Sequence, residues 1–255
     1  MTRLRVVALQ ELRDLWLVGR GLPLMLAYAV LLSVTGYLVA SNQALNFLEQ
    51  REAVSLTIQV AVGVAALLVL VVSADALSGE RERGTLESLL LTPSPRWVLV
   101  LGKGAAAMCL WLVAYAVSVP YLWYLARGTG VLGRALAGGF VVGTLIALFL
   151  CGLGLVISSL VSSNRIALAV SFFVLLALFF PTQLPTGAQG GAADFLLRAG
   201  PVTAGLHYLG NLVVRAQPVQ QDAGWLIGPV VLAVVAVGAA VLVGSRLSLR
   251  PGRRP

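Results

Sequence analysis

The densest charge in this sequence lies in one short run between two long apolar stretches. Residues Glu80 to Arg83 alternate acid, base, acid, base, and Gly84-Thr85 follows them directly. A mixed-charge run of this kind suits salt bridges with a complementary surface, and it lacks the paired nucleophile and base of a catalytic site. The run therefore predicts a docking site.

A short amphipathic helix is predicted to follow the charged run. Thr85 can cap its N-terminus, Glu87 lies in the first turn where the helix dipole favours an acid, and Pro93 prevents its continuation. Its apolar face consists of leucines at spacings i, i+3 and i+4, namely Leu86, Leu89 and Leu90. A helix of about two turns is marginal alone in water, so it needs a second surface, either its own bundle or another protein.

The other reactive side chains form no recognisable catalytic or metal site. Gly102-Lys103-Gly104 departs from a nucleotide-binding P-loop, because Trp97 stands where the first glycine is required and Gly104 replaces the hydroxyl residue. Lys103 is expected either to reach the inner lipid headgroups or to pair with an acid of the charged run. Asp75 is expected to pair with a nearby base. We predict no catalytic residue, no metal ligand and no cofactor in this chain.

The composition predicts a membrane protein. Of the 255 residues 59% are hydrophobic and 11% charged, and the mean hydropathy is +0.93, whereas soluble domains carry about a quarter charged residues. A bilayer crossing takes about 20 residues. Six runs are long enough, near 22–40, 54–74, 98–126, 135–161, 166–180 and 225–244. Since the alternation of a membrane barrel is absent, we predict an all-α integral membrane protein with one domain, residues 1–255, and six spans.

The basic residues predict the orientation. With both termini inside, 13 of the 18 Lys and Arg fall on the cytoplasmic side, and only Arg51, Arg127, Arg134, Arg198 and Arg215 fall outside. The charged run is then cytoplasmic as well. The net charge of +8 follows from this topology and from attraction to anionic lipid, and it predicts no nucleic-acid partner, because no folded domain carries a clustered basic face.

Three further features complete the expected architecture. Residues 1–20 predict an amphipathic helix in the inner interface, with Trp16 at headgroup depth. Residues 181–224 are too long for a simple connection and too apolar for water, so short re-entrant or interfacial helices are expected before the last span. Trp111 and Tyr115, one turn apart in the third span, are candidates to line a pathway, although aromatics at this spacing are more often packing.

At the charged run the sequence resembles the permease subunits of ABC-2 type exporters. Their hallmark is an acid-base-acid-base run, then Gly-Thr-Leu-Glu, a leucine cluster, a proline and a nearby Gly-Lys. Here these are Glu80 to Arg83, Gly84 to Glu87, Leu89 to Leu91, Pro93 and Gly102-Lys103. The motif covers about a tenth of the chain and lies between the second and third spans. The rest of the resemblance is topology.

The resemblance implies roles for these residues. Segment 79–93 becomes a cytoplasmic coupling helix that contacts a separate ATPase, which binds ATP and Mg. The implied contact residues are Glu80, Arg81, Glu82, Arg83, Gly84, Thr85, Leu86, Glu87, Leu89, Leu90 and Pro93. Secondary contacts are implied for Leu12 and Trp16 of the N-terminal elbow helix, for Lys103, and for Asn164 and Arg165 after the fourth span. A second permease subunit, identical or related, would complete the pathway.

Three functions remain open. The first is a permease subunit that couples ATP hydrolysis by a partner ATPase to export of an amphipathic or otherwise undetermined substrate across the cell membrane. The second is a scaffold or force-transmitting subunit that passes no cargo itself. The third is an integral membrane enzyme. The missing P-loop points to an external ATPase in the first two cases.

Overall fold

A computed structural model describes residues 2–41, 47–85, 95–180, 200–215 and 223–245. Within these ranges every element of regular structure is helical, which confirms the predicted all-α fold. The elements in chain order are α1 (Thr2–Arg13), the π-helix η1 (Asp14–Val18), α2 (Gly21–Ala40), α3 (Phe47–Glu82), α5 (Arg96–Leu125), α6 (Leu132–Leu160), α7 (Asn164–Phe179), α9 (Pro201–Val214), the 3-10 helix η3 (Ala223–Leu226) and α10 (Ile227–Ser245).

Five of the described helices are long and apolar enough to cross a bilayer, namely α2, α3, α5, α6 and the helix formed by η3 and α10. The predicted fifth span, α7, has 16 residues and is shorter than these. The count of six spans therefore stays a prediction. With 36 residues, α3 is about 54 Å long at 1.5 Å per residue and exceeds a hydrocarbon core of about 30 Å.

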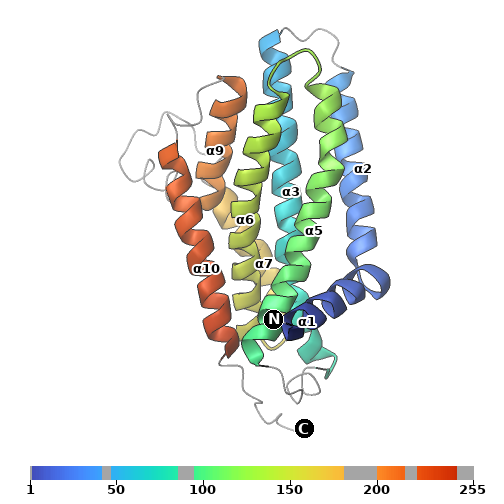
Figure 1. Cartoon of the computed structure of the whole chain (residues 1–255), viewed down its shortest axis with the longest axis vertical. Coiled ribbons are helices and arrows are strands. Elements are labelled where there is room, and N and C mark those ends of the chain that lie inside the picture. The colour runs from blue at the N-terminus through green and yellow to red at the C-terminus, as the bar shows by residue number, and fades with distance from the viewer. Residues whose placement is uncertain (1, 42–46, 86–94, 181–199, 216–222, 246–255) are drawn as a thin grey trace.

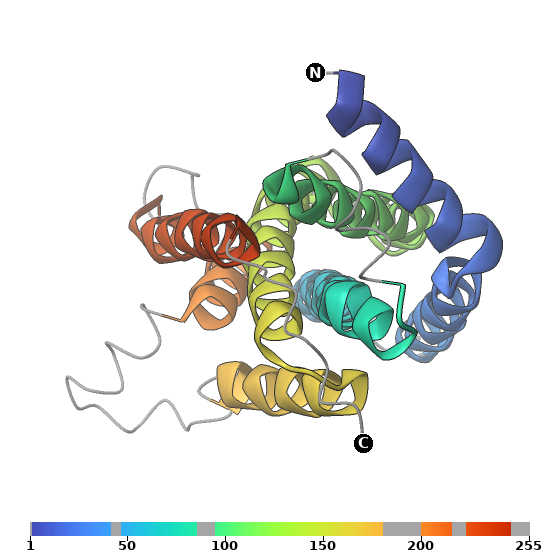
Figure 2. The same ribbon diagram turned by 90° about the horizontal axis from the view of Figure 1, so that it is seen from below.

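Helix α6 is the centre of the bundle (Figure 2). It packs against α3, α5, α9 and α10, while α2 lies against α3 and α5, and α7 lies against α3. Helix α1 crosses one end of the bundle beside α5, and the last turns of α3 and α10 reach the same end (Figure 1). We call this the α1 end. Helix α9 lies toward the opposite end.

The basic residues divide between the two ends as the sequence predicts. Arg5 and Arg13 belong to α1 and Arg96 begins α5, so they lie at the α1 end. Arg51 in the first turns of α3 and Arg134 in the first turn of α6 lie at the opposite end. This division follows the positive-inside pattern if the α1 end is cytoplasmic.

The outward surface of α2 is apolar. The large hydrophobic residues of this helix that are more than half exposed are Leu22, Leu26, Val30, Val34, Tyr37 and Leu38. A soluble protein does not place such a stripe in water, whereas lipid tails solvate it at no cost. Together with the long apolar helices, this stripe identifies a multi-pass membrane protein.

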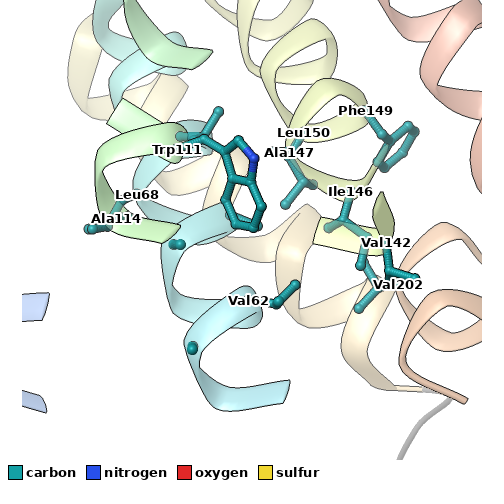
Figure 3. Packing of buried hydrophobic residues seen from close by; sticks show 14 of the residues in the cluster. Val62, Leu68, Trp111, Ala114, Val142, Ile146, Ala147, Phe149, Leu150 and Val202 are labelled. Atoms are coloured by element: carbon teal, nitrogen blue, oxygen red, sulfur yellow. The ribbon is translucent and has the colours of Figure 1, made fainter. Parts of the chain in front are cut away.

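The core gathers around Trp111, whose side chain is fully buried among α3, α5 and α6 (Figure 3). Its indole Nε1 donates to Thr144 Oγ1 at 3.1 Å, so the one polar atom of the ring is satisfied inside the bundle. Tyr115 packs on Trp111 with ring centroids 5.6 Å apart, and its hydroxyl donates to the carbonyl of Leu136. Both residues pack in the α5–α6 contact of this chain, and their proposed lining of a pathway stays a prediction.

Residues 181–224 are described only in part. Residues 181–199 and 216–222 lie outside the described residues, and α9 is a 14-residue helix with Pro201 at its first position. Its buried side packs against α3, α6 and α10, so α9 belongs to the bundle. Its predicted re-entrant or interfacial character stays a prediction, as does the interfacial position of α1.

Glycines let the central helix approach its neighbours closely. The indole of Trp111 lies over Gly143, and Ile58 of α3 lies over Gly139. At Gly152 the contact is with backbone, because an added β-carbon would lie 2.6 Å from the carbonyl carbon of Ala236 in α10. Small residues at helix crossings permit this close packing in membranes.

Replacing Gly152 by alanine is expected to destabilise the bundle, because the backbone of α10 cannot yield as a flexible side chain can. We expect a loss of about 1–3 kcal/mol in the free energy of unfolding, the usual cost of overpacking. Unfolding in detergent micelles measures this. Gly133→Ala is the control, since nothing lies within 4 Å of a β-carbon there. Equal stability of the two variants would contradict the prediction.

Candidate functional site

The charged run is helical and belongs to α3. The sequence pattern placed the end of the second span near Ala74 and treated Glu80 to Arg83 as a lead-in to the next helix, but α3 continues to Glu82. The helix continues because the polar groups of its last turns find partners on neighbouring helices. Gly79 has no β-carbon, and this leaves room for the side chain of Asp75 one turn earlier.

Gly84 and Thr85 end α3. Gly84 has φ +72°, a left-handed conformation that glycine adopts without strain. The amide of Gly84 donates to the carbonyl of Arg81, and the amide of Thr85 donates to the carbonyl of Glu80. This pair of bonds is a Schellman motif, which satisfies the last carbonyls of a helix. The Thr85 hydroxyl also donates to the Glu80 carbonyl, so the Gly-Thr of the motif terminates the preceding helix.

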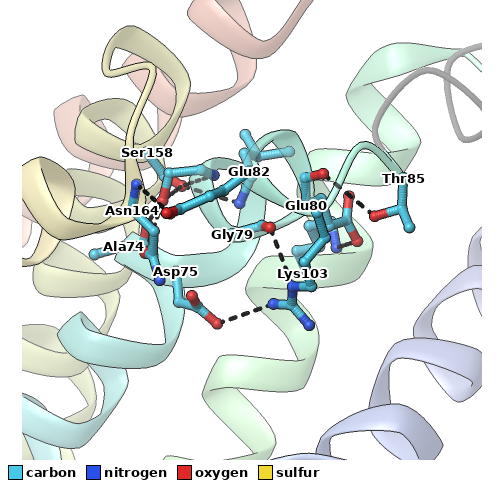
Figure 4. A network of polar contacts seen from close by, with 12 residues as sticks. Ala74, Asp75, Gly79, Glu80, Glu82, Thr85, Lys103, Ser158 and Asn164 are labelled. Atoms are coloured by element: carbon cyan, nitrogen blue, oxygen red, sulfur yellow. Dashed lines mark hydrogen bonds and ion pairs between the residues drawn. The ribbon is translucent and has the colours of Figure 1, made fainter.

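Glu80 and Lys103 form the centre of the site (Figure 4). Lys103 Nζ donates to Glu80 Oε1, and it lies 3.0 Å from both carboxylate oxygens of Glu11 in α1. Only 4% of the Lys103 side chain is exposed, against 16% for Glu80 and 20% for Glu11. Lys103 thus pairs with an acid of the charged run, one of its two predicted roles, and does not reach toward headgroups. One ammonium joins three helices.

Arg81 and Glu82 bind the two helix ends of the α6–α7 turn. Arg81 donates to the carbonyls of Val161 at 2.6 Å and Ser159 at 3.2 Å, at the C-terminus of α6. Glu82 Oε2 accepts the amide of Asn164, the first residue of α7, at 3.0 Å. Helix C-termini expose carbonyls and attract cations, and helix N-termini expose amides and attract anions. The positive Arg81 therefore binds the C-terminus of α6, and the negative Glu82 next to it binds the N-terminus of α7.

Buried hydroxyl groups join α3 to α6 beneath these charges. Ser158 Oγ accepts the amides of Leu77 at 2.9 Å and Ser78 at 2.8 Å (Figure 4). The Ser78 hydroxyl donates to the carbonyl of Ala74 and lies 3.1 Å from Asn164 Oδ1. Ser158 and Ser78 are fully buried. Their bonds fix the last two turns of α3 against the α6–α7 turn.

Arg83 makes the outermost contact of the run. Its guanidinium lies 3.5 Å from Asp75 Oδ2, with 64% of the Arg83 side chain and 21% of the Asp75 side chain exposed. This confirms that Asp75 pairs with a nearby base. An exposed pair at this distance contributes at most about 1 kcal/mol, so Arg83 remains available to a partner.

The remaining predicted contact residues are distributed as follows. Gly84, Thr85 and Arg165 are exposed, while Leu12 and Trp16 are half-buried, and Trp16 packs against the chain's own core. Leu86, Glu87, Leu89, Leu90 and Pro93 lie outside the described residues. Contact of any of these residues with an ATPase stays a prediction.

Sequence reasoning missed Glu11 and Ser158. Glu11 shares a helix face with Leu4, Ala8 and Leu15 at spacings of three and four residues. An acid among apolar neighbours needs a buried basic partner, and this was a usable signal. Ser158 offered no such signal, because its role depends on the approach of α6 to the end of α3.

One comparison with known proteins identifies a family for most of the chain. The model of a family described as ABC-2 family transporter protein matches residues 7–194. The matched range begins in α1 and includes α3, α5, α6 and α7, hence every residue of the ion cluster and of the α6–α7 turn. No curated protein matches the sequence.

Arg81 and Arg83 offer a test of the site, since they are two residues apart and differ in burial. Arg81→Met removes two charge-assisted bonds to orphan carbonyls, and we expect it to lower the free energy of unfolding by about 1.5–3 kcal/mol. Arg83→Met should change it by less than about 1 kcal/mol, because the pair is exposed. Unfolding in detergent measures both, and equal losses would show that Arg81 does not hold the α6–α7 turn.

Proposed function

The chain belongs to the ABC-2 family of transporter proteins, and from this premise we propose that it is the transmembrane subunit of an exporter driven by a separate ATPase. The ATPase binds and hydrolyses ATP with Mg, and its movement acts on the end of α3. A permease of this family is a membrane subunit and generally not itself catalytic. The chain also lacks a P-loop.

The observation that carries this proposal is the position of the charged motif. The last turn of α3 extends beyond the apolar length of the span and lies at the same end as α1 and the end of α10. Arg83, Gly84 and Thr85 are exposed there and lead directly into residues 86–94. A partner at this end can contact Arg83, Gly84 and Thr85 without entering the bundle. The orientation we propose places this end, with both termini, in the cytoplasm.

The motif divides into two parts in this proposal. Glu80, Arg81 and Glu82 are bound by the chain's own helices and transmit force. Arg83 to Pro93 provide the docking surface. When the ATPase displaces the docking surface, Glu80, Arg81 and Glu82 pass this displacement to α5, α6 and α7. A rigid-body rocking of the bundle would begin in this way.

A second permease subunit, a copy or a relative of this chain, completes the pathway in this proposal. The exposed surface of the long helices is apolar, which fits an amphipathic cargo better than a small ion. In the alternative function, a scaffold that transmits force without passing cargo, the same ATPase contact is used. Movement of substrate into sealed vesicles separates the two.

Charge reversal at Glu87 tests the docking surface. We expect the wild-type chain to copurify with an ATPase and Glu87→Lys to lose both the complex and coupled ATP turnover, because the acid of the motif becomes a base. Glu52→Lys makes the same charge change on an exposed residue at the opposite end of α3 and should preserve both. Intact assembly of the Glu87 variant would contradict the proposal.

A further inference from the structure

The cluster of Glu11, Lys103 and Glu80 joins helices that are remote in the sequence. Glu11 is near the end of α1, Lys103 is in the second turn of α5, and Glu80 is in the last turn of α3. Helix α1 also packs closely on α5, since an added β-carbon at Gly102 would lie 2.7 Å from Val7. In the described part of the chain, the ammonium of Lys103 is the only ion-pair link from α1 to the coupling end of α3.

The charges of the cluster do not balance. Two carboxylates share one ammonium, whose nitrogen lies within hydrogen-bond distance of Glu11 Oε1, Glu11 Oε2 and Glu80 Oε1. Glu80 Oε2 is buried without a hydrogen-bond partner in the described residues. A Lys103–Glu80 pair alone would balance the charge of the lysine, with no repulsion from a second carboxylate. Glu11 is therefore not needed to neutralise this site.

Removing each member should have a different effect. Loss of Lys103 leaves two half-buried carboxylates near each other without a cation between them, and this destabilises the fold whatever the function is. Loss of the Glu11 charge leaves a neutral Lys103–Glu80 pair, so the stability of the bundle should not fall. What is lost is the link between α1 and α3. The Glu11 variant can thus separate a mechanical role from a structural one.

We propose that Glu11 and Lys103 are positioning residues that make α1 move together with the coupling end of α3. This inference rests on the proposed function, because the force comes from the ATPase acting on segment 83–93. With the link intact, displacement of Glu80 carries Lys103 and Glu11 with it, and α1 follows as one body with α3 and α5. Without it, α3 moves and α1 does not.

The test compares Glu11→Gln with wild type in the full chain bound to its ATPase. Spin labels at Leu9→Cys and Leu56→Cys, in a background with Cys109→Ala and Cys151→Ala, report the distance between α1 and α3. Both labelled positions are exposed and lie outside the cluster and the coupling segment. We expect one narrow distance in wild type with and without ATP and Mg, and a broad distribution in Glu11→Gln. Coupled ATP turnover should fall about fivefold, which is typical of a coupling change near 1 kcal/mol.

Asp14→Asn is the matched control, because it removes the same charge from an exposed position just beyond α1 and should match wild type. The inference is overturned if Glu11→Gln keeps the narrow distance and the wild-type turnover. It is also overturned if the thermal stability of the variant falls with the turnover, since the role is then structural. Absence of a complex in wild type would instead overturn the proposed function. In that case the label distances of wild type and Glu11→Gln, measured without the ATPase, would still decide whether Glu11 holds α1 to α3.

Discussion

The charges at the end of α3 must be neutralised by groups of the protein, and the arrangement of the α1 end depends on this constraint. Uncompensated charge at a buried helix contact costs several kcal/mol, so each charged side chain needs a partner of opposite sign in reach. Glu80 takes the ammonium of α5, Arg81 the carbonyls that end α6, and Glu82 the amide that begins α7. The register of α3 relative to three other helices follows from these contacts.

Because of this constraint, the alternating charges of Glu80 to Arg83 do not form a simple docking patch. Successive residues of a helix point in directions about 100° apart, so four consecutive charges cannot all face one partner. In the structure they contact different groups of the same chain, and Glu82 and Arg83 are exposed whereas Glu80 and Arg81 are half-buried. The motif is therefore a junction inside the subunit, and the proposed docking surface begins where this junction ends.

The central helix explains how such a junction can act on the whole bundle. Glycines of α6 let its neighbours pack closely on it: Ile58 of α3 lies over Gly139, Trp111 of α5 over Gly143, and the backbone of α10 against Gly152. Tightly packed interiors transmit displacement and do not absorb it. A movement at the end of α3 would therefore reach the other helices through the same contacts that stabilise the fold. The packing of α6 would in this way support the energy coupling proposed for the family motif.

The sequence by itself determined the helical fold class, the long apolar helices, the division of basic residues between two ends and the family to which the chain belongs. These properties depend on composition and on the spacing of residues close together in the chain, and both can be read directly from the amino-acid sequence. It also indicated that Lys103 and Asp75 pair with charges nearby. It did not predict that the helix of the second span continues to Glu82, because hydropathy falls at Asp75.

Only the tertiary structure decided which groups the charged residues bind. Glu11 meets Lys103 across 92 positions of the chain, and Ser158 meets the end of α3 across about 80. No local pattern specifies such pairs, because they require α1, α5 and α6 to be packed at particular heights against α3. The structure also showed that Gly84-Thr85 ends α3, while the expected cap of a following helix by Thr85 stays a prediction, because residues 86–94 lie outside the described residues. This helix end depends on the left-handed backbone of Gly84, which its residue type permits but does not require.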